Sequence, residues 1–388
     1  MYNLLIIVIY LAFISLGLPD SLLGASWPIM HLDIGIDLSA MGIISMIISS
    51  GTVVSSLLSE KLTRRFSTRT VTTVSVFLTA LALLGFSYST NIWMIIIFAI
   101  PYGLGAGAID AALNNYVAIH YSSKHMSWLH CFWGVGTIVS PFIMSYSLSN
   151  SNWNSGYRTV AYIQISIAFI LLLSKPLWKR QEGSVTYDSQ SDTKGIGIVG
   201  ALKISGVIPL LIGFFAYCAA EGTVMSWACT YLVEHKQLSE IDAAAFASLF
   251  FIGMTIGRFL AGFIMDKLGD WKMILLGTIL SSIGMLLMII PTKESALALI
   301  GLITIGLGFA PIYPCIIHST PNNFGDENSG SIIGIQMASA YMGFTFIPPL
   351  FGIIAKLTGF VIFPFYIILF TFLMIIMLKK TFTQTANK

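Results

Sequence analysis

Long apolar runs separated by short polar breaks recur along the whole chain of 388 residues. A bilayer core of ~30 Å needs about 20 apolar residues in a helix, and each of these runs is long enough to provide them. The pattern therefore predicts an all-α membrane protein with twelve transmembrane helices. The expected spans are residues 3–31, 40–60, 70–89, 92–119, 127–149, 157–177, 203–233, 240–265, 273–291, 295–318, 329–356 and 359–379.

One polar stretch, KRQEGSVTYDSQSDTKG at 179–195, divides the twelve spans into two halves. It follows the sixth span and has the composition of a flexible linker. We therefore expect an N-terminal six-helix bundle at 1–178, a cytoplasmic linker at 179–202 and a C-terminal six-helix bundle at 203–388.

The composition excludes a water-soluble protein. Hydrophobic residues make up 56% of the chain and charged residues only 10%, whereas soluble domains carry about 25% charged residues. The net charge of +3 gives no indication of a nucleic-acid partner. The four cysteines lie singly in apolar runs without metal-binding spacing, so we expect packing roles for them and neither a metal nor a cofactor.

The distribution of Lys and Arg predicts the orientation of the chain, because cytoplasmic loops are enriched in both. With the N-terminus inside, the cytoplasmic loops and the C-terminal tail hold fifteen of these residues, and the outer loops hold four. Both termini are therefore expected in the cytoplasm. The low charge, the lack of a recognisable targeting signal and the compact layout favour a bacterial inner membrane, with a monomeric chain surrounded by lipids.

Three short patterns recur in the same order in both halves, at offsets of about 203 to 207 residues. SSLLSEKLTRRF ends the second span, and GFIMDKLGDWK ends the eighth. GLGAG at 103–107 corresponds to GLGFA at 306–310, and GTIVSP at 136–141 corresponds to GFTFIP at 343–348. A six-plus-six duplication explains this order, and it predicts a substrate site near mid-membrane between the halves.

The pattern small-x-x-x-acid-basic-x-x-basic after the second and eighth spans resembles the signature loop of the major facilitator superfamily. The first copy departs from it at Ser56, Glu60 and Thr63, where the family prefers Gly, Asp and Gly. The resemblance implies a pseudo-symmetric fold in which these charges latch cytoplasmic helix ends. Alternatively, the charges only mark the cytoplasmic face. The residues expected to act in gating are Glu60, Arg64, Arg65, Arg258, Asp266 and Lys267.

Several charged residues lie inside apolar runs. A charge at the centre of a bilayer costs at least about 2.5–3.5 kcal/mol, so such residues face the interior of the helix bundle and usually have a function. A buried carboxyl group favours its neutral form, and it can therefore take up a proton on one side of a membrane and release it on the other. The charged residues in question are Asp20, Asp110, Glu221 and Arg258.

Amide and aromatic side chains lie on the same helical stripes as these charges. Asn114 follows Asp110 by one turn, and Gly103 and Gly107 precede it on the same face. Rings beside amide, hydroxyl and carboxyl groups suit a sugar, which offers a C–H face for stacking and hydroxyls for hydrogen bonds. The residues expected to bind substrate are Asn114, Asn115, His130, Trp133, Trp27, Trp227 and Gln336.

Two segments resemble the fucose–glucose/galactose proton symporter family within the superfamily. DAALNNY at 110–116 is similar to that family's fourth-span acid and the Asn four residues later, although Asn115 replaces a Pro. HCFWGVG at 130–136 is similar to a fifth-span segment in which Gln takes the place of His130. The resemblance implies proton symport of a sugar. We expect Asp110 to be the main protonation site, Asp20 to relay or tune it, and Glu221 to take part in the coupling.

Alternative functions and roles are compatible with these patterns. A proton-coupled antiporter that exports drugs or metabolites needs the same embedded acids, whereas an enzyme or receptor is disfavoured because the sequence has no nucleotide-binding loop, metal cluster or nucleophile motif. Asp110 could bond only to Asn114, and Asp20 could satisfy backbone groups freed by Pro19. His318 is expected to be solvated at a cytoplasmic helix end.

Overall fold

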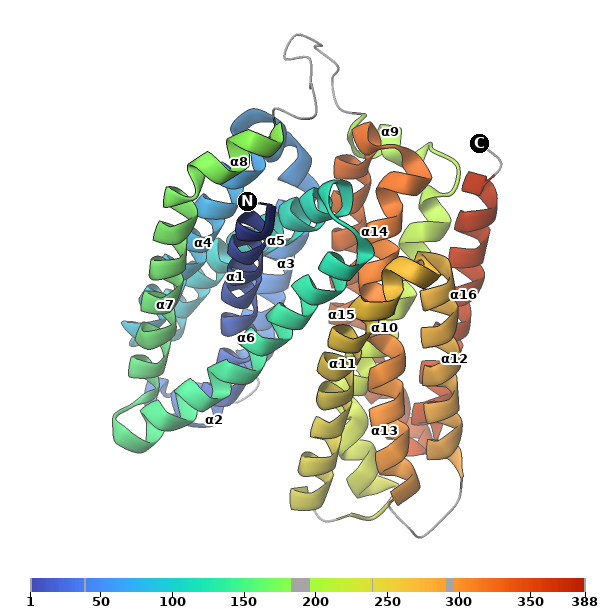
Figure 1. The fold of residues 1–388 in the computed structure, drawn as a ribbon. Helices are drawn as coiled ribbons and strands as arrows, with labels where there is room; N and C mark the ends of the chain where they lie inside the picture. The colour runs from blue at the N-terminus through green and yellow to red at the C-terminus, as the bar shows by residue number, and fades with distance from the viewer. Residues whose placement is uncertain (1, 38–39, 183–195, 239, 291–295, 387–388) are drawn as a thin grey trace. The chain divides into compact units, whose positions relative to one another are not determined.

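The computed structural model describes residues 2–37, 40–182, 196–238, 240–290 and 296–386 (Figure 1). Within these ranges the regular structure is helical and no strand is present, which confirms the predicted all-α fold. The helices are α1 (Tyr2–Asp20), α2 (Leu22–Ile34), α3 (Ala40–Phe66), α4 (Thr68–Ser87), α5 (Ile92–His120), α6 (Ser123–Asn150), α7 (Trp153–Leu173), α8 (Lys175–Glu182), α9 (Gly197–Leu202), α10 (Val207–Glu234), α11 (Glu240–Leu268), α12 (Asp270–Ile289), α13 (Ala296–Phe309), α14 (Ile312–Phe324), α15 (Asp326–Thr358), η1 (Phe360–Ile362) and α16 (Phe363–Ala386).

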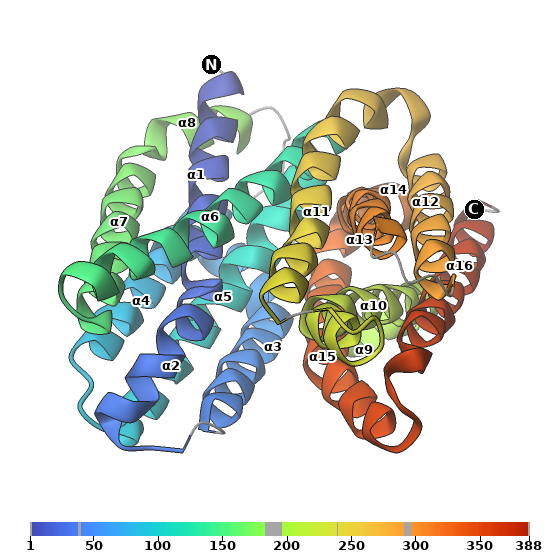
Figure 2. The same ribbon diagram turned by 90° about the horizontal axis from the view of Figure 1, so that it is seen from below.

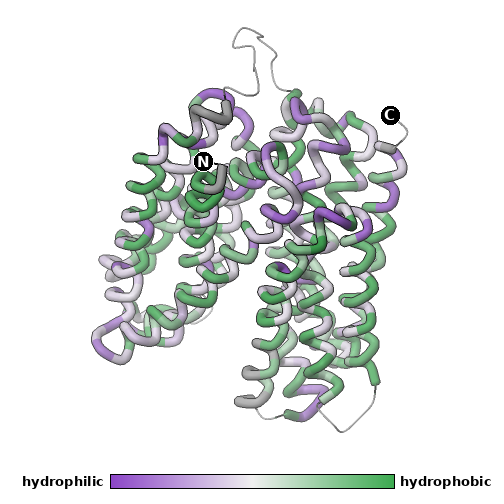
Figure 3. The backbone as a smooth tube through the Cα atoms, viewed as in Figure 1, coloured by the Kyte–Doolittle hydropathy of each residue, from purple (hydrophilic) through white to green (hydrophobic). Residues whose placement is uncertain are grey.

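Twelve segments of the described chain are helical, long and apolar enough to cross a membrane. Most residues along these helices are hydrophobic, and hydrophilic residues gather mainly at helix ends and in the connections between helices (Figure 3). The number of spans agrees with the sequence prediction, and their ends differ by up to nine residues. The first span, for example, is Leu4–Ile34 rather than 3–31, and the last is Phe360–Thr385 rather than 359–379.

Two of the twelve spans are interrupted helices. α1 and α2 are separated at Ser21, directly after Pro19, which lacks a backbone N–H and disturbs the turn around it. α13 and α14 are separated at Ala310–Pro311, and α14 continues α13 in one column (Figures 1 and 2). The first interruption leaves Asp20 at the end of a helix inside a membrane-spanning segment.

The chain forms two compact units. Unit 1 comprises Met1–Tyr116 and Phe132–Gly197, and unit 2 comprises Val117–Cys131 and Ile198–Lys388. These units differ from the expected halves in one segment, because Val117–Cys131 groups with the C-terminal helices although it joins two N-terminal ones. We call Val117–Cys131 the α5–α6 hairpin, since it contains the end of α5 and the start of α6.

The expected linker at 179–202 is partly helical. α8 covers its first residues and α9 its last, while its central part, 183–195, lies outside the described residues. α8 packs on unit 1 through Trp178, which is buried, lies with its ring 4.9 Å from that of Tyr116, and donates from Nε1 to Ser174 Oγ at 3.0 Å. The helical end of unit 1 therefore extends beyond the predicted sixth span.

Glycines allow the helix backbones to approach closely in both units. In unit 2, α12 and α13 pack through Gly284 against Gly301 and through Gly277 against Gly308, and a Cβ atom on any of the four would collide with the facing helix. In unit 1, Gly103 of α5 contacts the α3 backbone in the same way. In lipid, helix association depends on such van der Waals packing, because burial from water no longer drives it.

Replacing a glycine at this interface is expected to destabilise unit 2. Gly284→Leu forces α12 and α13 apart, and overpacking of this kind costs about 1–3 kcal/mol, so the apparent melting temperature of the purified protein should fall. Gly42→Leu is the matched control, because a Cβ on Gly42 of α3 meets nothing within 4 Å. Thermal unfolding followed by tryptophan fluorescence measures both variants, and equal shifts would contradict the packing role.

Candidate functional site

The Asp20 carboxylate is held by two donors from other helices of unit 1. Its Oδ1 accepts a hydrogen bond from Tyr102 Oη at 3.0 Å, and its Oδ2 accepts one from Trp133 Nε1 at 2.8 Å. Tyr102 is buried in α5 and Trp133 is half-buried in α6, whereas Asp20 itself is exposed. The three residues therefore place a carboxylate, a phenol and an indole together at an exposed residue.

Close contact between α1 and α6 sets this geometry. A Cβ atom on Gly17 would collide with the Trp133 carbonyl, and one on Gly136 would collide with the α1 backbone, so the two helices touch. One turn beyond Gly17, the Ser21 hydroxyl donates to the Thr137 carbonyl at 2.7 Å. These contacts fix the Trp133 indole beside the interruption between α1 and α2, where Asp20 lies.

Asp110 is buried in α5 and bonds to a residue of its own helix. The Asn114 amide donates from Nδ2 to Asp110 Oδ1 at 2.7 Å and to the Asp110 carbonyl at 3.0 Å, and both side chains are buried. Asp110 follows Tyr102 by eight residues, which is about 12 Å along a helix. The glycines on its stripe, Gly103 and Gly107, contact the α3 backbone. Asn115 is next along α5 and is half-buried.

A buried ion pair joins α10 to α11 in unit 2. Arg258 Nη2 lies 3.4 Å from Glu221 Oε1, and the two side chains are only 4% and 7% exposed. The sequence assigned these residues to different roles, gating for Arg258 and proton coupling for Glu221, but the structure places them in one pair. Each charge depends on the other, because an isolated ion in an apolar interior carries a large desolvation penalty.

His130 belongs to an aromatic cluster of unit 2. Its side chain is buried, and its ring meets Tyr313 edge to face with the centroids 4.7 Å apart. Tyr313 also lies 4.7 Å from Phe214 and 6.1 Å from Tyr217. His130 and Trp133 were both expected to bind substrate, but their partners are in different units, with Trp133 bonding to Asp20 in unit 1.

The remaining predicted substrate residues occupy three different environments. Gln336 is fully buried in α15, where its Oε1 accepts from Thr320 Oγ1 at 3.0 Å, and its Nε2 has no hydrogen-bond partner among the described residues. Trp227 packs on α15 and donates from Nε1 to the Pro348 carbonyl at 2.8 Å. Trp27 is 2% exposed and belongs to the hydrophobic core of unit 1, which is the position of a packing residue.

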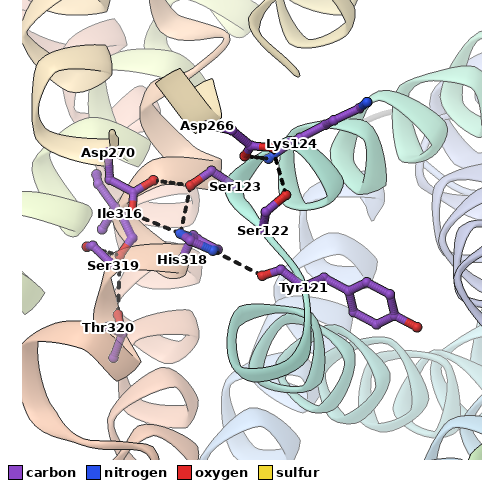
Figure 4. A network of polar contacts seen from close by, with 10 residues as sticks. All are labelled: Tyr121, Ser122, Ser123, Lys124, Asp266, Asp270, Ile316, His318, Ser319 and Thr320. Carbon is purple, nitrogen blue, oxygen red and sulfur yellow. Dashed lines mark hydrogen bonds and ion pairs between the residues drawn. The ribbon is translucent and has the colours of Figure 1, made fainter. Parts of the chain in front are cut away.

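The predicted gating residues differ between the two copies of the signature loop. In the first copy, Arg64 pairs with Glu60 on the same helix at 3.0 Å, and Arg65 lies over the Phe66 ring. In the second copy, Asp266 accepts hydrogen bonds from the Ser122 hydroxyl and the Lys124 backbone N–H in the α5–α6 hairpin, at 3.0 and 3.1 Å (Figure 4). Lys267 beside it is exposed.

An open cavity of about 450 Å³ lies in unit 1 between α2 and α6. Its lining includes two serines of α6 but none of the predicted site residues. The cavity is lined by Ala25, Pro141, Ser145, Leu148 and Ser149.

No group of three or more His, Cys, Asp or Glu side chains in the described part of the chain is arranged to hold a metal ion.

Breaking the buried ion pair is expected to be more harmful than removing both charges. Arg258→Met leaves the Glu221 carboxylate without its cation and should cost about 3–5 kcal/mol, whereas Glu221→Gln combined with Arg258→Met should regain most of that loss. Thermal unfolding of the single and double variants measures the difference.

The pair of Glu60 and Arg64, in which the Arg64 side chain is 43% exposed and that of Glu60 is 10% exposed, provides the comparison for this experiment. Its single and double neutral variants should shift stability by only about 0.3–0.5 kcal/mol, since such i,i+4 pairs are screened by solvent. A double variant at Glu221 and Arg258 that is no more stable than Arg258→Met alone would refute the coupling.

Comparison with known protein families gives one match that covers most of the chain. The family profile described as Major Facilitator Superfamily matches residues 9–342, and also 210–386.

Individual proteins are also similar to this chain. Bypass of stop codon protein 6 of Saccharomyces cerevisiae is 25% identical over 294 residues, which cover 68% of this chain and 58% of that protein. The glucose/mannose transporter GlcP of Bacillus subtilis is 25% identical over 274 residues, which cover 68% of this chain and 66% of that protein. The chain thus spans less than two thirds of the length of either relative.

A solved structure has the same fold. The crystal structure of the E. coli fucose:proton symporter FucP superimposes with a TM-score of 0.75 and covers 99% of this chain and 98% of its own. The sequences are 18% identical, so the likeness concerns the arrangement of the helices. It agrees with the twelve-span fold derived from the sequence.

Proposed function

Because the chain belongs to the Major Facilitator Superfamily, whose members are transporters rather than enzymes, we propose that it carries a small hydroxylated solute, most simply a sugar, together with protons. Transport then proceeds by alternating access of the two units. In this proposal both termini lie in the cytoplasm, the chain acts as a monomer, and the membrane is a bacterial inner membrane. The Lys and Arg distribution supports this orientation.

The geometry around Asp20 is the observation that carries the proposal. An exposed carboxylate can accept hydrogen bonds from sugar hydroxyls, and the Trp133 indole beside it offers a flat apolar face for sugar C–H groups. Tyr102 supplies a further hydroxyl. This combination provides both the hydrogen-bond partners and the flat apolar face that a hydroxylated solute can use.

Asp20 also provides a means of coupling transport to protons. Its anionic form accepts both the Tyr102 and Trp133 hydrogen bonds, whereas protonation places a hydrogen on one oxygen and weakens one of them. Protonation therefore changes how α1, α5 and α6 are tied together. One proton moving down ~100 mV supplies ~2.3 kcal/mol, and each 1.36 kcal/mol is a factor of ten, so a neutral solute could be accumulated about 50-fold.

The roles of the other acids follow from their environments. The sequence favoured Asp110 as the main protonation site, but Asp20 is exposed and Asp110 is buried with Asn114. We therefore infer that Asp20 exchanges the proton with solvent and that Asp110 tunes the response of α5. We assign Glu221 the role of compensating the positive charge of Arg258 within unit 2.

Known proteins similar to this chain support the substrate class. One relative is a glucose/mannose transporter, and the solved structure with the same fold is a fucose:proton symporter. Both names describe neutral sugars, and the second includes a coupled proton.

Transport assays in proteoliposomes test the function directly. We expect labelled hexoses or pentoses, tested as a panel beside cationic dyes, to accumulate inside vesicles when an inward proton gradient is imposed. Asp20→Asn should abolish this accumulation and retain exchange of substrate down its gradient, because the amide cannot release a proton. Asp33→Asn is the matched control, since Asp33 also accepts from an indole, Trp153 Nε1 at 2.8 Å, at the far end of α2.

Two results would count against the assignment. Dye export in place of sugar uptake would indicate the antiporter alternative. Proton-driven accumulation that survives in Asp20→Asn would move the coupling site to another residue, with Asp110→Asn as the next variant to measure.

The indole N–H of Trp133 is expected to contribute to substrate affinity by orienting Asp20. Trp133→Phe keeps an aromatic ring but removes the donor to Asp20 Oδ2. Hydrogen bonds to charged groups contribute about 1.5–3 kcal/mol, so the Kd for the transported sugar should rise about tenfold or more, as measured by equilibrium binding. Trp153→Phe, which removes the donor to Asp33, should leave the Kd unchanged. Equal Kd values in wild type and Trp133→Phe would place the substrate elsewhere.

A further inference from the structure

The α5–α6 hairpin is bound to the C-terminal helices through a polar network at its turn. Besides the two hydrogen bonds to Asp266, the Ser123 hydroxyl donates to Asp270 Oδ1 at 2.6 Å, and the Tyr121 carbonyl faces the ring of His318 on α14 (Figure 4). All of these residues belong to unit 2. The hairpin continues at both ends into unit 1, so this network holds the ends of two helices whose remaining length belongs to the other unit.

Both ring nitrogens of His318 face hydrogen-bond acceptors. Nδ1 lies 2.8 Å from Asp270 Oδ2 and 2.8 Å from Ser123 Oγ, and Nε2 lies 3.1 Å from the Tyr121 carbonyl oxygen. A backbone carbonyl can only accept, and the Ser123 hydroxyl hydrogen is already directed at Asp270. A neutral imidazole has one N–H, whereas the imidazolium has two. The arrangement therefore fits the protonated ring, and the neutral ring leaves one of the two contacts unmade.

The carboxylates around His318 favour a cation at this point, against the cost of burying the charge. Its side chain is 13% exposed and that of Asp270 is 10% exposed, so the pair is largely shielded from water. α11 adds the Asp266 carboxylate at longer range, and α14 itself adds the Cys315 thiol beside Asp270. The hairpin contributes the Lys124 ammonium, which lies 4.3 Å from the Trp128 ring centroid. Two carboxylates thus act on one imidazole.

The position of Asp270 makes this network specific to the second half of the chain. Aligned on Glu60 and Asp266, Arg64 of the first signature loop corresponds to Asp270 of the second. The first loop forms its ion pair within α3, between Arg64 and Glu60. The acid at 270 instead bonds to His318 on a different helix.

We propose that His318 is a proton-binding site that fastens the α5–α6 hairpin to α12 and α14, and that loss of its proton releases the hairpin. The ligand of this site is the proton itself, and the site is separate from Asp20, which belongs to unit 1. The proposal concerns the attachment of the hairpin and does not depend on which solute is carried. In this proposal, protonation of His318 controls how firmly the α5–α6 hairpin is attached to the other helices of unit 2. The chain enters this hairpin from unit 1 and returns from it to unit 1.

Hydrogen–deuterium exchange of the full-length protein in lipid nanodiscs tests this proposal. Exchange of peptides from the hairpin is measured from about pH 5.5 to about pH 8.5, a range that brackets the titration of histidine, and is corrected for the chemical exchange rate. Wild-type hairpin amides should lose about tenfold or more of their protection as the pH rises, which is the scale of one hydrogen bond to a charged group. Constant protection across the range would overturn the proposal.

Variants identify the group that titrates. His318→Gln keeps a polar side chain of similar size without a titratable proton, so its hairpin should exchange at every pH as wild type does at high pH. Asp270→Asn removes the anion and should reduce the pH response. His235→Gln is the matched control, because His235 caps α10 away from the hairpin and should leave the response unchanged. A wild-type pH response that persists in His318→Gln would refute the assignment, and the wild-type titration decides the matter if a variant does not fold.

Discussion

A charged side chain in a membrane helix is stable only when another group compensates it, and this constraint organises the polar contacts of the structure. Asp20 receives two hydrogen bonds, Asp110 receives the Asn114 amide, and Glu221 faces Arg258. In water such groups would be solvated individually. In an apolar bundle Asp20 and Glu221 fix the relative position of the helices that supply their partners, whereas Asp110 is compensated within α5. Asp20 and Glu221 are therefore points where neighbouring helices are held in register.

Glycines let helices approach closely enough for the partners of these charged side chains to reach them. The Trp133 indole meets Asp20 because Gly17 and Gly136 let α1 and α6 touch. A larger side chain at either position would move the indole away and leave one carboxylate oxygen without its donor. Sequence position alone thus does not determine the chemistry of Asp20, because its partners come from α5 and α6 and are brought to it by backbone packing.

The helices were predictable because hydrophobicity and span length are local properties. The twelve spans followed from them, and so did the choice of embedded acids such as Asp20 as candidate site residues. The pairing of Glu221 with Arg258 did not, because the two residues lie on different helices and periodicity gives no information about which faces meet. Tyr102 was missed for the same reason, since nothing in the fourth span marks its hydroxyl as a partner of the first span.

Burial is difficult to read from sequence. Trp27, which was expected to bind substrate, lies in the core of unit 1. His318 was expected to be solvated at a helix end, but its side chain is only 13% exposed. The sequence did contain a signal for His318, since an acid at Asp270 stands where the repeat pattern has a base. An acid in that place needs a donor, and the donor is on α14.

His130 and Trp133 lie one helical turn apart on α6, and their partners belong to unit 2 and unit 1 respectively. The residues between them, Cys131 and Phe132, include neither a glycine nor a proline, so this turn has no ready place to bend. α6 therefore carries, within one unbroken turn, a side chain that is bonded in unit 1 and another that is packed in unit 2.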